Sequence, residues 1–186
     1  MKKNSLLKVL FVSLIMCAGF ACKMPFGKGK AVGTGNTRDP KSVCSYLNSS
    51  GFKASMEYKS SGGNEYVCVS KSSHALPAGR SEIFSYSATG DAENVNHVGL
   101  MMFTNSTHKD GGDGDNAFAQ VSGELWQKVF SAPLPNDIKE AILANKGKNI
   151  QLVKHFSEPS VATVSRTPGS EGRYTLTLKI GLPPIG

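Results

Sequence analysis

The residues that could carry out chemistry are few in this chain of 186 residues, and they lie far apart. None of the histidines has the His-Glu-x-x-His spacing or a comparable ligand spacing; they are His74, His97, His108 and His155. The chain also contains no G-x-S-x-G nucleophile elbow and no dinucleotide-binding fingerprint. A catalytic triad can still be assembled by folding from distant positions. The pattern therefore lowers the expectation of an enzyme without removing it.

An aspartate-rich stretch, residues 105–116, is the one candidate for a metal site. Asp110, Asp113 and Asp115 suggest calcium, because hard cations bind several oxygen ligands on a flexible loop. Their spacing is not that of an EF-hand, and Lys109 adds a competing charge. We favour a solvated polar loop whose last residues cap the next helix. No metal and no cofactor is assigned, and the three aspartates remain the alternative.

Two cysteines in the body of the chain, Cys44 and Cys68, are predicted to form a disulfide. If the strands around the turn at 60–64 pair with Tyr58 opposite Tyr66, then Cys68 faces the side that the N-terminal helix covers. That helix carries Cys44, so the two sulfurs can meet. A bridge across 24 residues stabilises the fold by roughly 3–4 kcal/mol in the chain-entropy model. A metal or redox pair is the rival interpretation, but the chain has no Cys-x-x-Cys.

The first 21 residues have the three parts of a secretory signal peptide. Lys2, Lys3 and Lys8 precede an apolar run at 9–16, and small residues follow up to Ala21. The run is too short to span a bilayer, which takes about 20 apolar residues. We therefore expect export, with residues 1–21 removed.

The end of this leader resembles the lipobox of bacterial lipoproteins, in which the cysteine after the cleavage site is acylated. The matching residues are Gly19-Phe20-Ala21 before Cys22. The family prefers Leu where this chain has Gly19, so cleavage by the ordinary signal peptidase, giving a freely periplasmic or secreted protein, stays open. Pairing of the two later cysteines would leave Cys22 as an odd thiol, which lipidation, palmitate included, would occupy. By the same resemblance, Lys23 suits an outer-membrane anchor facing the periplasm.

Residues 22–38 read as a flexible tether rich in glycine and lysine, with a reach of roughly 20–24 Å. The basic charge of the chain belongs mostly to this part and to the leader. Of the 21 basic residues, three lie in the leader and four in the tether, which leaves fourteen against fourteen acidic residues. A neutral domain has no stripe that would follow a phosphate backbone, so we expect no nucleic-acid partner.

The elements that must position any site follow from periodicity. Asp39-Pro40 is typical of a helix start, and Gly51 of its stop. The expected strands are 53–59, 65–70, 81–89, 95–104, about 150–156, 161–166 and 173–180, and the expected helices in the middle of the chain are 116–131 and a second one ending at Gly147. The strand at 95–104 is apolar enough to suggest burial on both faces.

This order predicts an α+β fold: residues 39–186 form a single domain with a mainly antiparallel sheet, and the N-terminal helix and the central helix pair pack on one face. For function, we expect a non-catalytic binding or accessory module that recognises an envelope protein or a wall component; inhibition of a periplasmic enzyme is one form that this role could take. The alternatives are a small periplasmic hydrolase and a carrier of an apolar ligand. An exposed apolar patch or an open sheet edge would favour the binding module.

Overall fold

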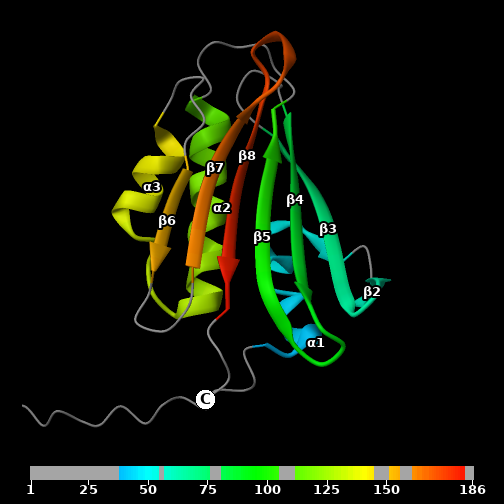
Figure 1. Ribbon diagram of the computed structural model, residues 1–186. Coiled ribbons are helices and arrows are strands. Elements are labelled where there is room, and N and C mark those ends of the chain that lie inside the picture. Colours follow the sequence, from blue (N-terminus) through cyan, green and yellow to red (C-terminus); the bar gives the residue numbers. More distant parts are fainter. Residues whose placement is uncertain are drawn as a thin grey trace, which may run out of the picture. The chain divides into compact units, whose positions relative to one another are not determined.

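An antiparallel sheet of eight strands forms one layer of the domain (Figure 1). The computed structural model describes residues 38–54, 57–75, 81–104, 112–144, 151–155 and 161–182. The strands are β1 Lys53–Ala54, β2 Lys59–Gly62, β3 Glu65–Ala75, β4 Ser81–Gly90, β5 Val95–Phe103, β6 Gln151–His155, β7 Val161–Pro168 and β8 Tyr174–Gly181. Their order in the sheet is β1-β3-β4-β5-β8-β7-β6, and β2 also pairs with β3.

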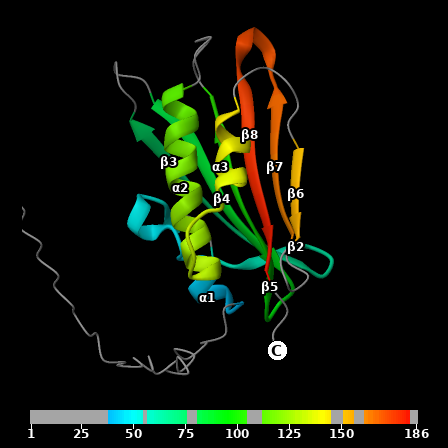
Figure 2. The same ribbon diagram turned by 90° about the vertical axis from the view of Figure 1, so that its left-hand side faces the viewer.

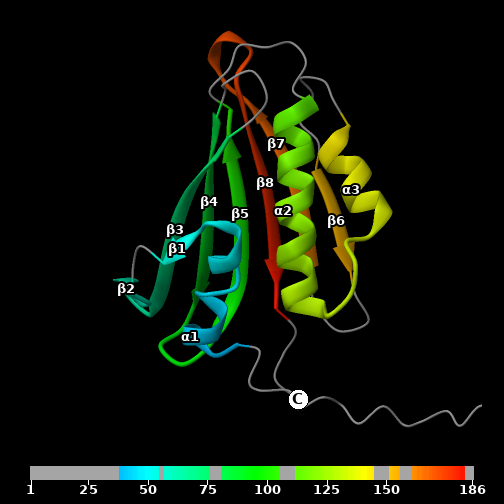
Figure 3. The ribbon, with the colours of Figure 1, turned by 180° about the vertical axis from the view of Figure 1, so that it is seen from behind.

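The helices α1 Pro40–Val43, α2 Gly112–Phe130 and α3 Asn136–Leu143 all lie on one face of this sheet. The sheet stands in front of them in Figure 1, and they stand in front of it when the domain is seen from behind (Figure 3). Figure 2 shows α2 running roughly along the strands. The predicted α+β class, with an N-terminal helix and a central helix pair on one face, is confirmed.

The hydrophobic core fills the space between the sheet and the helices. Phe84 of β4 lies between Phe52 and Phe118, with ring centroids 6.4 Å and 6.1 Å away. Aromatic pairs at such separations add to the burial of their apolar area. The largest fully buried side chains are Trp126, Tyr86, Phe52, Phe84, Phe118, Leu47, Leu100, Met102, Leu125, Ile138, Ile142 and Leu176.

The N-terminal helix begins as predicted but is shorter. The Asp39 carboxylate accepts a hydrogen bond of 2.8 Å from the Ser42 amide, and Pro40 occupies the first turn. Regular helix ends at Val43; turns and a 3₁₀ segment, Asn48–Ser50, lead to Gly51 at φ 82°. Serine side chains here bond the backbone locally, as Ser45 does to the Ser42 carbonyl at 2.7 Å, and such bonds compete with helix.

The register around the first hairpin differs in part from the prediction. β1 pairs Ala54 with Ser70, which is the register that places Tyr58 opposite Tyr66. In β2, however, Ser60 is the residue opposite Tyr66, because the chain has moved by two residues relative to β3 between the two strands. The Tyr58 and Tyr66 rings still contact each other, with centroids 5.8 Å apart.

β5 lies in the middle of the sheet, but the prediction that both of its faces are buried is wrong. Val98, Leu100 and Met102 are buried under the helices, whereas Phe103 on the other face is 42% exposed. Because all described helices pack on one side, nothing from them covers that second face. The apolar run of β5 therefore contributes side chains to the open surface.

The central helices differ from prediction mainly at their ends. α2 starts at Gly112, four residues before the expected Asn116, and α3 ends at Leu143, with residues 145–150 outside the described part. Acidic side chains in the first turn of α2 favour the earlier start through the helix dipole. None of the helices in the described ranges has both the length and the apolarity that a membrane span needs.

Candidate functional site

The predicted disulfide is present and joins α1 to the sheet. Cys44 and Cys68 are bonded, with Cα atoms 6.1 Å apart. Tyr86 makes a second link between the same elements, because its hydroxyl donates to the Val43 carbonyl at 2.7 Å. Burial raises the pKa of that phenol. Cys22, the leader and the tether up to residue 37 lie outside the described residues.

The aspartates considered for calcium do not form a loop site in the described residues. Asp113 and Asp115 belong to the first turn of α2, and Asp110 lies outside the described part. Asp115 is 2% exposed and points into the domain. Among the residues that the structure describes, no three His, Cys, Asp or Glu side chains come together to hold a metal ion.

Asp115 instead forms a buried ion pair with Arg166 of β7. One Arg166 nitrogen lies 2.6 Å from Oδ2 of Asp115 and 3.2 Å from the Ile142 carbonyl of α3. The Tyr174 hydroxyl donates to Oδ1 of Asp115 at 2.5 Å, and the guanidinium lies 4.0 Å from the centre of the Tyr174 ring. Burial first, and then the bond to Asp115, raises the pKa of Tyr174.

This network connects α2, α3, β7 and β8. Both oxygens of the Asp115 carboxylate are engaged, and each charged side chain is almost fully buried. A buried pair of this kind is costly to break, because removing one partner leaves the other charge unpaired. We therefore assign Asp115, Arg166 and Tyr174 to the architecture of the helix-covered side.

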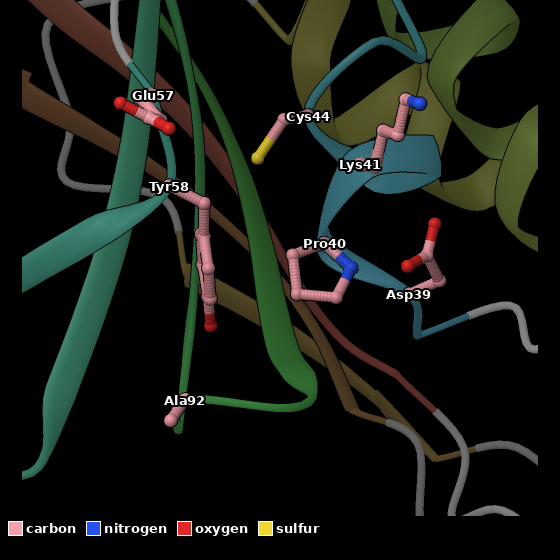
Figure 4. Close-up of a pocket in the computed structure, with 7 residues that line it drawn as sticks. All are labelled: Asp39, Pro40, Lys41, Cys44, Glu57, Tyr58 and Ala92. Carbon is pink, nitrogen blue, oxygen red and sulfur yellow. The ribbon is translucent and has the colours of Figure 1, made fainter.

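A pocket of about 510 Å³ opens beside the disulfide (Figure 4). Two of its polar side chains bind the local backbone: Asp39 caps α1, and the Tyr58 hydroxyl donates to the Asp91 carbonyl at 2.7 Å. The hydrogen bonds from Ser42 lower the pKa of Asp39, and burial raises the pKa of Tyr58. The lining residues are Asp39, Pro40, Lys41, Cys44, Glu57, Tyr58 and Ala92.

The open face of the sheet carries an apolar pair. Ile83 of β4 and Phe103 of β5 lie directly opposite each other in the register. They are 40% and 42% exposed, and they are the large hydrophobic side chains that the described part of the chain leaves exposed. Met101, half-buried, points to the same face two residues along β5. Adjacent apolar side chains on a surface are typical of an interaction site.

Next to this pair the same face is hollowed. A depression of about 290 Å³ lies over β4, β5 and β8. Gly99 of β5 is among its lining residues and is paired with Ser87 on one side and Lys179 on the other. The lining residues are Glu65, Ser85, Ser87, Thr89, His97, Val98, Gly99, Leu100, Met101, Thr177 and Lys179.

His97 is the histidine whose side chain can be placed, and it lies on this open face. Partial burial lowers its pKa, and the positive charges of Lys179 and Arg38 lower it further. His97 is one of the residues that line the hollow. The side chains of His74 and His155 are not described, and His108 lies outside the described residues.

Sequence reasoning missed the residues that define both faces. Arg166 continues the apolar alternation of Ala162 and Val164, so its place in the pattern marks it as a buried charge. Ile83 and Phe103 stand at the positions of their strands that alternate with buried residues. For Ile83, a large apolar side chain at an outward position of the strand was the available signal.

No family model matches this chain, and comparison with the curated proteins and with the solved structures gives no match either.

Proposed function

We propose that this protein is an exported cell-envelope lipoprotein whose domain acts as a non-catalytic binding module for another envelope protein. The observation that carries the proposal is the open sheet face with its exposed cross-strand pair, Ile83 and Phe103. Exposed apolar side chains cost solubility, so a surface that keeps them next to each other is best explained by a partner that covers them. The proposed partner is a protein because apolar anchors surrounded by polar side chains are typical of protein interfaces.

The proposal of a non-catalytic role is supported by what the titratable groups do. The lowered carboxyl pKa values belong to Asp39, which caps α1, and to Asp91, which accepts hydrogen bonds from the amides of Glu93 and Asn94 in the β4–β5 turn. The buried carboxylate of Asp115 is held by Arg166 and Tyr174. The lowered pKa values of Asp39 and Asp91 therefore have a structural cause in hydrogen bonds to the backbone.

The proposed anchor is an acylated Cys22, placing the domain on the periplasmic side of the outer membrane. Pairing of Cys44 with Cys68 leaves Cys22 without an intramolecular partner in the mature chain. Replacing Cys22→Ala should move the protein from the membrane fraction to the soluble periplasmic fraction. A Cys22→Ala variant that stays in the membrane fraction would contradict lipidation.

The binding role is tested by co-purification from detergent-solubilised envelopes. The double variant Ile83→Ser/Phe103→Ser should recover at least about tenfold less partner than the wild-type protein does. Apolar anchors supply much of the binding energy of such an interface. The matched control is Lys128→Ser, on the exposed side of α2. Equal recovery with wild type, double variant and control would show that the open face binds nothing.

A further inference from the structure

The hollow on the open face includes a position without a side chain, Gly99, on the central strand β5. A Cβ atom at Gly99 would lie 3.1 Å from Oγ of Ser87 and 3.9 Å from the Leu178 carbonyl. Gly99 does not have a positive φ, so its backbone does not require glycine. Its absent side chain leaves room for a small group of a partner between β4 and β8.

The walls of the hollow offer hydrogen bonds that the domain does not use. Ser85, Ser87 and Thr89 line it from β4, and Thr177 lines it from β8. Within the described residues, these four hydroxyls make no side-chain hydrogen bond. Half-buried hydroxyls without a partner are suited to receive a polar group of a ligand.

The charge around the hollow is positive on its β8 side, where Lys179 lies opposite Gly99. Lys179 lines it and, among the described residues, has no ion-pair partner. Arg38, which is bonded to Val95 and Asn96, adds a second positive charge felt by His97. The one acidic lining residue, Glu65, belongs to β3, three strands away from Lys179 in the sheet order. This arrangement favours an anionic group near Lys179.

The hollow and the apolar pair are aligned along one strand. Gly99 and Phe103 both belong to β5 and point to the same face. Their separation of four residues corresponds to about 13 Å along a strand. An extended peptide places the side chains of residues four positions apart on one side at the same separation.

We infer that the hollow receives a side-chain carboxylate from an extended segment of the partner protein, while an apolar side chain four positions away in that segment packs on Ile83 and Phe103. The inference rests on the proposed binding function and names the chemistry of its partner. The carboxylate accepts a hydrogen bond from the Ser87 hydroxyl, which lies opposite Gly99, and is paired with the Lys179 ammonium on the other side of Gly99. A lysine in its place would meet a like charge.

The test is an NMR titration of the full mature chain, ¹⁵N-labelled and carrying Cys22→Ala so that it stays soluble. The probe is a short serine/threonine peptide with one glutamate and, four positions later, one phenylalanine. We expect saturable shifts of the Ser87, Gly99 and Lys179 amides with a Kd of about 0.1–1 mM, as is usual for a contact of this size. A peptide with glutamine in place of glutamate should bind about fivefold more weakly, and one with lysine more weakly still.

Three protein variants locate the carboxylate. Lys179→Gln should weaken the glutamate peptide about fivefold and leave the glutamine peptide unchanged. Gly99→Val should fill the hollow and weaken the binding of both peptides by at least about tenfold. Gly99→Ala should reduce the affinity less and perturb the fold less. Lys128→Gln, on α2, is the matched charge control and should change nothing.

The inference is overturned if none of the peptides shifts these amides, if the three peptides bind equally, or if Lys179→Gln and Lys128→Gln behave alike. Capture of the same protein by phosphatidylglycerol vesicles in the absence of peptide binding would likewise overturn it, in favour of lipid phosphate. The proposed function is tested separately from this inference. If Ile83→Ser/Phe103→Ser reduces co-purification while Lys179→Gln and Gly99→Val do not, the proposed function stands and the inference about the carboxylate fails.

Discussion

The helix-covered face and the open face of the sheet are built from the same strands, in alternation along each one. On β5, Leu100 is fully buried and its neighbour Met101 is half-buried on the other side. The covered face uses large apolar side chains, together with the almost fully buried ion pair of Asp115 and Arg166. The open face uses mostly serine, threonine and glycine, with Ile83 and Phe103 as its exposed apolar residues.

This difference separates stability from recognition. A side chain on the covered face contributes through burial and leaves a cavity when it is shortened. A side chain on the open face buries little area in the folded domain and therefore contributes little to the free energy of unfolding. Such a side chain can instead contact a partner. Substitutions on the covered face should therefore have large effects on the free energy of unfolding and only indirect effects on binding. Substitutions on the open face should show the reverse.

The largest expected effect is at the buried ion pair. Arg166→Met leaves the Asp115 carboxylate buried without its counter-charge, and we expect a loss of about 3–5 kcal/mol in the free energy of unfolding, measured in urea. The matched control is Glu171→Gln, which breaks the exposed pair with Arg173 and should cost less than about 1 kcal/mol. Adding Asp115→Leu to Arg166→Met should recover much of the lost stability. Equal effects of Arg166→Met and Glu171→Gln on the free energy of unfolding would contradict the assignment.

A smaller effect is expected from shortening apolar side chains of one strand. Leu100→Ala, under the helices, should cost about 2–5 kcal/mol of unfolding free energy. Phe103→Ala, on the open face, should cost less than about 1 kcal/mol although it removes more atoms. If thermal or urea unfolding shows Phe103→Ala to be the more damaging, the open face is part of the core and the comparison breaks.

The smallest expected effect is at the cap of α1. Hydrogen bonds from Ser42 lower the pKa of Asp39 below its ordinary value of 3.8. The stabilisation is therefore fully present above pH 3.8 and is lost as the pH falls through the lower value in the folded state. Asp39→Ala should cost about 1 kcal/mol at pH 7. Urea unfolding should show that the difference in unfolding free energy between wild type and Asp39→Ala is smaller at pH 2–3 than at pH 7. The same difference at both pH values would rule out the ionised cap.

Periodicity predicted the covered face well. The alternation of Leu176, Leu178 and Ile180 and the helical spacing of Phe118, Val121 and Leu125 predicted strand and helix, and all six residues are buried. The Cys44–Cys68 bridge followed from the same reasoning, because it needed only that a helix cover the face to which Cys68 points. Local sequence patterns suffice to predict strands and helices whose hydrophobic faces pack against each other in the core.

The open face could not be predicted in the same way. An apolar residue such as Phe103 in a continuous apolar run carries no mark of which side is covered, since this depends on where the distant helices pack. The buried role of Asp115 was missed for a related reason: its partner Arg166 is 51 residues away and meets it only after α2 lies on β7 and β8. Long-range partners of this kind are fixed by tertiary structure.

The most direct measurement of the central claim is site-specific photo-crosslinking in living cells, with a benzophenone amino acid placed singly at Phe103, at Ile83 and, as control, at Lys128. We expect one discrete crosslinked protein, the same from Phe103 and Ile83, and no such product from Lys128. Crosslinks from Lys128 alone, or none from either residue of the open face, would contradict the assignment of that face as the binding surface.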